Sequence, residues 1–243
     1  MKFAVQVYSV RDCIHSTEEF FEVLGKIKAL GFDGVEFAGF HGASAEALKA
    51  RLDELGLVPV GAHLGLDDWR EDKLESTRAY LRTIGAKAAG IGGCKTDTEE
   101  SLKDMMSVLG AAYKRAAEEG ITVYFHTHTG EFVPTEDSPD DRTQIERIAE
   151  VCATQIDTYW SFVAGIDTCA YLREHRDRIP FIHIKDGIGG TPKALGEGEN
   201  ELENIAATVS ELGYEWVILE NDDPVPDGLS DIARSMKWLR EHF

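Results

Sequence analysis

The residues best suited to chemistry lie in the stretch 121–132, where an apolar, β-branched and aromatic run leads into two histidines and a glutamate. Such a run predicts a strand that is buried on both faces. His126 and His128 are two positions apart, so in an extended chain they point to the same face. Together with Glu131, they could hold a metal ion or exchange protons with a substrate. The alternative is a pair of core or loop histidines that are satisfied by hydrogen bonds.

Polar residues also follow the other strands that the sequence predicts. We expect strands at 3–8, 32–37, 57–63, 87–91, 121–125, 155–157, 180–184 and 216–219. The residues at or just beyond their ends are Gln6, Tyr8, Glu36, His63, His126, His128, Glu131, Asp157, His183, Lys185, Asp186, Glu220, Asn221 and Asp222. A histidine or a carboxylate stands at six of the eight ends, the first and fourth strands being the exceptions. Chance placement of polar residues in loops does not readily explain this pattern.

Amphipathic helices separate these strands. We expect helices at about 16–30, 44–55, 69–84, 98–119, 143–151, 168–174, 202–212 and 229–240. In the first helix the apolar residues keep a 3.6-residue period, and Gly31 ends it. Strand–helix alternation requires parallel strands with right-handed crossovers.

Eight such units in 243 residues predict a (β/α)8 TIM barrel, with residues 1–243 as one domain. The rival is a doubly wound open sheet, but its Gly-rich phosphate turn is replaced here by residues 6–10. In a TIM barrel the active residues come from the C-terminal ends of the strands. We therefore expect the polar strand ends to meet on one rim.

The charge of the chain restricts its partners. It carries 44 acidic and 25 basic residues, a formal net charge of −19. Such a surface repels phosphate backbones and anionic lipids, so we expect neither nucleic acid nor a membrane as a partner. No apolar run approaches the roughly 20 residues of a membrane span, and residues 1–2 lead directly into a strand, so we expect a cytoplasmic protein. A small-molecule substrate is compatible with all of this.

Several strings of residues together resemble a known family. They are residues 6–12 (QVYSVRD), 126–132 (HTHTGEF), 157–160 (DTYW), 183–186 (HIKD), 195–198 (LGEG) and 218–220 (ILE). In this order, and over essentially the whole chain, they resemble the sugar phosphate isomerase/epimerase family of the xylose-isomerase-like barrel superfamily.

The resemblance implies one divalent cation, held by a glutamate on strand five, an aspartate on strand six, a histidine on strand seven and a glutamate on strand eight. Asp157, His183 and Glu220 match the last three positions. We expect Glu131 to be the fourth ligand. Relatives place the glutamate where this chain has His126, so His126 or His128 is the substitute if the loop that carries Glu131 does not fold back. This ligand set suits Mn²⁺, Mg²⁺ or Co²⁺, and Zn²⁺ is also compatible.

The same residues could carry out proton transfer. A cation that bridges two sugar oxygens stabilises the enediolate formed when a proton leaves next to a carbonyl. Glu131 and Glu220 could then act as base and acid on the two faces of the sugar. Lys185 could polarise an oxygen or bind an anionic group, or form a salt bridge with Asp157 or Asp186. The residues expected to bind or shape the substrate are Gln6, Tyr8, Glu36, His63 and Trp160. For Gln6 the alternative is a hydrogen bond in the barrel floor, and for Trp160 it is packing against the rim.

These features predict a metal-dependent sugar isomerase or epimerase. One alternative is a metal-dependent lyase or dehydratase that acts on a keto-sugar, keto-glycoside or keto-cyclitol, with His126 or His128 as the acid that protonates the leaving oxygen. A second alternative is a non-catalytic sugar-binding barrel. The net charge of −19 excludes the abasic-site endonucleases of the superfamily, which bind DNA. A homo-oligomer is compatible with this type of barrel.

Overall fold

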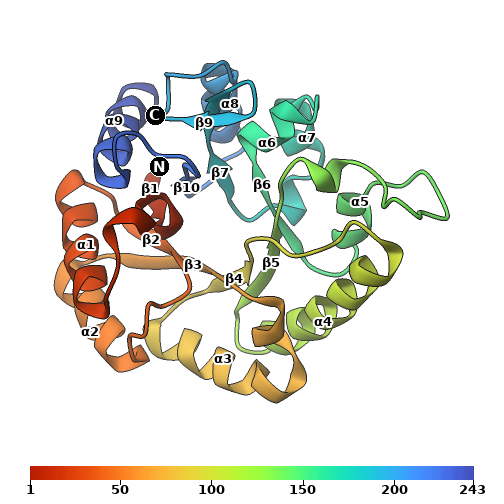
Figure 1. Ribbon diagram of the computed structural model, residues 1–243, viewed down its shortest axis with the longest axis horizontal. Helices are drawn as coiled ribbons and strands as arrows, with labels where there is room; N and C mark the ends of the chain where they lie inside the picture. The colour runs from red at the N-terminus through yellow and green to blue at the C-terminus, as the bar shows by residue number, and fades with distance from the viewer.

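Eight short apolar runs form parallel strands that close into one barrel (Figure 1). The computed structural model describes residues 1–243. The barrel strands are β1 (Lys2–Gln6), β2 (Gly34–Ala38), β3 (Val58–Leu64), β4 (Ala88–Ile91), β5 (Thr122–His126), β6 (Ala153–Asp157), β7 (Ile182–Ile184) and β10 (Trp216–Leu219). Around the barrel their order is β1-β10-β7-β6-β5-β4-β3-β2. The expected (β/α)8 barrel is confirmed.

Helices surround the barrel on all sides (Figure 1). They are α1 (Thr17–Leu30), α2 (Ala45–Leu55), α3 (Glu71–Ile84), α4 (Glu99–Ala117), α5 (Gln144–Ile148), α6 (Thr158–Val163), α7 (Thr168–Glu174), α8 (Leu202–Glu211) and α9 (Gly228–His242). Ser16 and Ser44 accept backbone N–H bonds at the starts of α1 and α2, and Gly31 and Gly56 end these helices in the left-handed conformation. None of the helices combines the length and the apolar character that crossing a membrane requires.

Besides shifts of two or three residues in several element bounds, three local features differ from the expectation. β1 ends at Gln6 rather than at Tyr8, because the Gln6 side chain accepts the N–H of Tyr8 and starts the 3-10 segment Val7–Cys13. α6 was not expected; Asp157 begins it by accepting two backbone N–H bonds. A hairpin of β8 (Asp186–Ile188) and β9 (Thr191–Lys193) follows β7, and its strands are too short to show a pattern in the sequence.

The barrel has two apolar layers. Outward-facing strand residues such as Val35 and Val123 pack against helix residues such as Leu24 and Leu109 in the larger core. A smaller cluster fills the interior and consists of Ala4, Val60, Ala88, Tyr124, Ala153, Phe181 and Ile218. Side chains two positions apart on a strand share a face, so the residues two positions beyond Ala4, Tyr124, Ala153, Phe181 and Ile218 also point into the barrel. On β3 a register shift changes the phase after Val60, so that Ala62 belongs to the outer core and Gly61 faces Glu36 inside. The inward-facing residues that follow the interior cluster along the strands form the candidate active site.

Candidate active site

A polar layer lies directly above the apolar interior cluster. Two positions beyond Ala4, Tyr124, Ala153, Phe181 and Ile218 stand Gln6, His126, Gln155, His183 and Glu220. All five side chains are buried. The closed barrel therefore brings together polar groups that are far apart in the sequence, as expected from the strand ends.

Three of these inward side chains and Asp157, at the end of β6, form a compact group, which we call the central cluster: His126, Asp157, His183 and Glu220. Each contributes one potential ligand atom, and the four atoms lie within 4.8 Å of one another. His126 Nε2 is 3.9 Å from Asp157 Oδ2 and 3.7 Å from Glu220 Oε2. His183 Nδ1 is 2.9 Å from the same oxygen of Glu220.

A buried ammonium lies beside the central cluster. Lys185 Nζ is 2.8 Å from Asp157 Oδ2, 2.7 Å from Glu220 Oε2 and 2.7 Å from Asp222 Oδ2. Burial by itself would lower the pKa of Lys185, but the three carboxylates outweigh it and raise the pKa, so the amine stays protonated. Of the two expected ion pairs of Lys185, the one with Asp157 forms. The carboxylate of Asp186 instead accepts backbone N–H bonds.

The charges of the site leave a negative excess. Burial opposes charging of His183, but the carboxylates of Glu220 and Glu36 outweigh it and raise the pKa of His183 to about 10. When the carboxylates of Glu36, Asp157, Glu220 and Asp222 are all ionised, four negative charges face one ammonium and one imidazolium, an excess of two (4 − 2). If His183 gives up its extra proton to bind a cation, the excess becomes three (4 − 1), and a divalent cation would offset most of it.

The donor atoms also fit a cation. His126 Nε2 is buried and has no hydrogen-bond partner, and the buried Asp157 Oδ2 has only the ammonium of Lys185 beside it, at 2.8 Å. Leaving a buried nitrogen such as His126 Nε2 unpaired costs on the order of 1–3 kcal/mol. A cation between these two atoms would satisfy both. Two imidazoles and two carboxylates form a donor set that can hold a divalent cation.

Glu131 lies outside the central cluster. The chain leaves the β5 direction after His126 and forms the 3-10 turn Gly130–Phe132, so Glu131 does not reach the central cluster. Its Oε2 instead accepts the backbone N–H of His128, at 2.7 Å. The fourth position of the cluster is occupied by His126, the substitute that the sequence left open.

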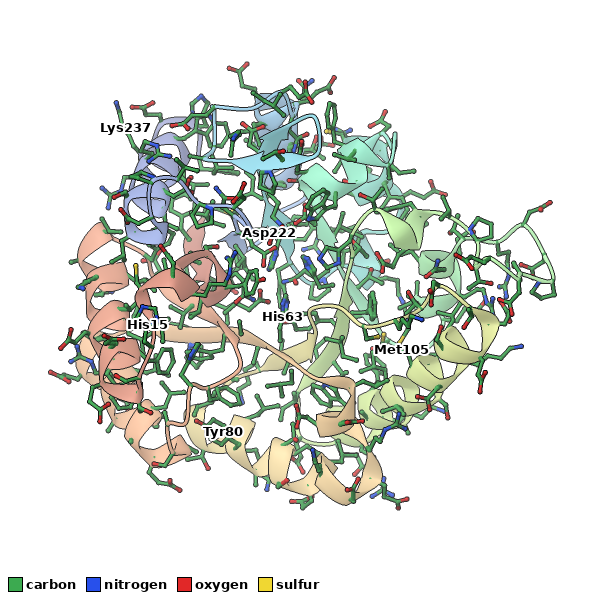
Figure 2. The ribbon with its side chains drawn as sticks, viewed as in Figure 1. His15, His63, Tyr80, Met105, Asp222 and Lys237 are labelled. Carbon is green, nitrogen blue, oxygen red and sulfur yellow. The ribbon has the colours of Figure 1, made fainter.

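A cavity of about 510 Å³ opens above the central cluster. Its lining comprises Tyr8, Ala38, His63, Leu64, Gly92, Gly93, His126, His128, Glu220 and Asp222. Figure 2 shows His63 and Asp222 near the barrel centre, whereas Lys237 and His15 lie at the periphery. Neither His63 Nδ1 nor the ring nitrogens of His128 make a hydrogen bond within the protein. A cavity of about 350 Å³ between α3 and α4 contains none of these groups.

The remaining expected substrate-binding residues have different positions. Gln6 Nε2 donates to Glu36 Oε2 at 2.7 Å, so Gln6 makes the barrel-interior hydrogen bond that was its alternative. Glu36 is fully buried and does not line the cavity. Burial would raise its pKa, but His63 and His183 outweigh burial and lower the pKa to about 2. Trp160 lies outside the cavity lining, and its Nε1 donates to Asp222 Oδ2 at 3.2 Å. Tyr8 remains 42% exposed at the cavity mouth.

Two residues of the site were missed in the sequence. Tyr124 donates its hydroxyl to Glu36 Oε1 at 2.6 Å. Gln155 contacts Glu36, His63 and His126. The available signal for Gln155 was a polar residue two positions before Asp157, on the same face of a buried strand.

The chain is similar to known proteins both in sequence and in fold. A family model described as a xylose isomerase-like TIM barrel matches residues 24–242. The inosose dehydratase of Geobacillus kaustophilus is 24% identical over 86% of this chain and 82% of its own length. The inosose dehydratase of Erwinia tasmaniensis is 24% identical over 92% of this chain and 90% of its own length. The crystal structure of a sugar phosphate isomerase/epimerase from Parabacteroides distasonis has a TM-score of 0.79 at 20% identity, covering 99% of this chain and 98% of that one.

Proposed function

The chain belongs to the xylose isomerase-like TIM barrel family, and from this premise we propose that it is a metal-dependent dehydratase that removes water from an uncharged polyhydroxy ketone. The observation that carries the proposal is the position of Glu131. Epimerisation by two carboxylates needs one on each face of the substrate. Glu220 lies in the cavity wall, but Glu131 is bonded to the backbone of His128 and is absent from the wall.

The other carboxylate of the wall, Asp222, already accepts from Lys185 Nζ and Trp160 Nε1, so imidazoles are the groups left free to exchange a second proton. His63 and His128 both line the cavity and have ring nitrogens without a partner in the protein. An imidazole can act as an acid or a base near neutral pH, which suits the removal of a proton and the protonation of a departing hydroxyl. The names of the two curated relatives, both inosose dehydratases, support the same class of reaction.

The reaction would proceed as a β-elimination. His126, Asp157, His183 and Glu220 would hold the cation. When bound, the cation would supply stabilisation of the negative charge that develops on the ketone oxygen. One of the two cavity imidazoles accepts the proton from the carbon next to the ketone, and a carbon–carbon double bond forms as the β-hydroxyl leaves. The other imidazole gives that hydroxyl a proton, so the products are an unsaturated ketone and one water.

The cavity wall argues for an uncharged substrate. No arginine or lysine lines the cavity, whereas the carboxylates of Glu220 and Asp222 do. The nearby ammonium of Lys185 already contacts three carboxylates. A phosphorylated sugar would meet negative charge without a free cation, whereas the hydroxyls of a polyol can donate hydrogen bonds to these carboxylates.

The test is a product analysis in deuterated water. The protein, supplied with Mn²⁺, Co²⁺ or Zn²⁺, is incubated with a panel of keto-cyclitols and keto-sugars, and the products are analysed by mass spectrometry. We expect a product that has lost one water, and no such product with Asp157→Ala. A product of unchanged formula that carries solvent deuterium would identify an isomerase or epimerase. Binding of a polyol without any conversion would support the non-catalytic barrel.

A further inference from the structure

The side-chain amide of Gln155 is fixed by a carboxylate. Both Gln155 and Glu36 are fully buried, and Gln155 Nε2 donates to Glu36 Oε1 at 2.7 Å. An ionised carboxylate only accepts hydrogen bonds, so the NH₂ group of the amide must face Glu36. The amide oxygen therefore points in the other direction, toward the imidazoles.

That oxygen determines which ring nitrogens carry protons. Gln155 Oε1 lies 2.9 Å from His126 Nδ1 and 2.9 Å from His63 Nε2. Because an amide oxygen only accepts, both of these nitrogens must donate. In the neutral rings the lone pairs are then on His126 Nε2 and on His63 Nδ1.

Both lone pairs face functional groups. His126 Nε2 has no partner and faces Asp157 Oδ2 and Glu220 Oε2, at 3.9 and 3.7 Å. His63 Nδ1 lies beside Gly92 in the cavity wall, where a Cβ at Gly92 would come within 2.5 Å of it. The missing side chain at Gly92 keeps this nitrogen accessible.

We propose that Gln155 is the positioning residue of this site: it fixes the tautomers of His126 and His63, and thereby directs one lone pair into the central cluster and the other into the cavity. The metal-binding consequence rests on the proposed function, whereas the proton positions do not. In the proposed elimination, His63 Nδ1 is then the nitrogen that accepts the proton.

Glutamine is the residue type that these contacts require. A glutamate at this position could accept from both imidazoles but could not donate to Glu36. A methionine would match the length of the side chain, but it could neither donate to Glu36 nor accept from the two imidazoles. The chain also offers a matched control, because Gln6 is equally buried and donates to the same carboxylate, but has no hydrogen bond with an imidazole.

The experiment reads the tautomers directly in metal-free protein. Histidine is labelled with ¹⁵N, and long-range proton–nitrogen NMR spectra are recorded for the wild type, Gln155→Met and Gln6→Met, with the His126 and His63 signals assigned by single substitutions. We expect the wild-type His126 ring to be protonated at Nδ1, the less common tautomer of a free histidine. Gln155→Met should lose this preference, and Gln6→Met should keep it. Protonation of His126 at Nε2 in the wild type, or an unchanged tautomer in Gln155→Met, would overturn the inference.

A rescue keeps the test decisive if Gln155→Met does not fold. The double variant Glu36→Gln, Gln155→Glu exchanges the amide and the carboxylate. The carboxylate at position 155 still accepts from His126, and the amide at position 36 can donate to that carboxylate. We expect the Nδ1-protonated His126 to be retained in this pair. Its loss in a folded double variant would contradict the assignment.

Metal titration separates this inference from the proposed function. We expect Gln155→Met to bind Co²⁺ or Zn²⁺ about tenfold or more weakly than Gln6→Met, because outer groups that orient a ligand typically contribute 10- to 100-fold to affinity. Equal affinities would refute the positioning role. If the wild type shows the expected tautomers but binds no cation, the proposed function fails while the assignment of the proton positions stands.

Discussion

Lys185 Nζ lies 2.7 Å from Glu220 Oε2, the same oxygen that is 2.9 Å from His183 Nδ1 and 3.7 Å from His126 Nε2. The ammonium therefore shares an oxygen of the central cluster. In the metal-free protein it is the main positive charge that compensates Asp157 and Glu220. A cation that enters the cluster must share these oxygens with Lys185 or displace it toward Asp222, its third carboxylate partner.

Replacing Lys185 with methionine should destabilise the metal-free protein and increase the stabilisation that metal provides. Removing one partner of a buried ion pair typically costs on the order of 3–5 kcal/mol. Added Co²⁺ or Zn²⁺ would compensate the buried carboxylate charges that have lost the ammonium, so thermal unfolding should show a larger metal-induced rise in Tm for Lys185→Met than for the wild type.

Lys2→Met is the control, since it also removes a lysine from an ion pair, the one with Glu215, but at the exposed surface and outside the central cluster. Its metal-induced rise in Tm should stay close to that of the wild type. An equal rise in Lys185→Met and the wild type would show that the ammonium does not compensate the cluster.

The fourth position of the cluster can be tested by metal content. His126→Ala removes one of the four converging atoms, whereas Glu131→Gln changes a group outside the cluster that bonds to His128 N–H. We expect elemental analysis to find about one transition metal per chain in the wild type and in Glu131→Gln, and loss of that metal in His126→Ala. Metal loss in Glu131→Gln with retention in His126→Ala would instead support Glu131 as the ligand.

The barrel could be predicted because its signals are local. The alternation of apolar strands with helices fixes the class, and the expected bounds of α7 at 168–174 agree with the structure. Asp157, His183 and Glu220 could also be expected at one rim, since parallel strands bring their carboxyl ends together. Period-two alternation above Phe181 and Ile218 then directs His183 and Glu220 inward.

The rest of the site depends on contacts between distant elements. The direction of Glu131 follows from a 3-10 turn that no periodicity reveals. The role of Gln155 depends on hydrogen bonds from β6 to β2, β3 and β5, which exist only once the barrel has closed. The hairpin β8–β9 has three-residue strands, and these carry too little pattern to be recognised.

The Asp186 carboxylate should be essential for the segment that follows β7. It accepts the backbone N–H groups of Gly187, Gly196, Gly198 and Asn200 at 2.9–3.1 Å. A side chain at Gly198 would clash with it, since a Cβ there would lie 2.1 Å from Asp186 Oδ1. We expect Asp186→Ala to lower the free energy of unfolding by about 3 kcal/mol, because several charge-assisted hydrogen bonds are lost.

Chemical denaturation measures this loss, and Asp186→Asn provides the comparison because it keeps one accepting oxygen. The asparagine variant should fall between alanine and the wild type. Alanine and asparagine variants of equal stability would indicate that the carboxylate does not organise this segment.

The ion pair between Glu99 and Arg147 should make stability depend on acid pH. Arg147 Nη2 lies 3.1 Å from Glu99 Oε2, and Lys103 Nζ lies 2.9 Å from the same oxygen. The hydrogen bonds from Arg147, and then from Lys103, lower the pKa of Glu99 from its usual 4.5 to about 2. A carboxyl whose pKa is lower in the folded state contributes its full stabilisation above the unfolded pKa and loses it as the pH falls toward the folded pKa.

We therefore expect Glu99→Gln to lower the Tm most above about pH 5, with the difference from the wild type shrinking between about pH 4.5 and pH 2. Thermal unfolding across this range measures the difference. Glu22→Gln is the control, because Glu22 is exposed on α1 and forms no ion pair, so its Tm should follow the wild type at every pH. A constant Tm difference between Glu99→Gln and the wild type would mean that the stabilising contact does not depend on the charge of Glu99.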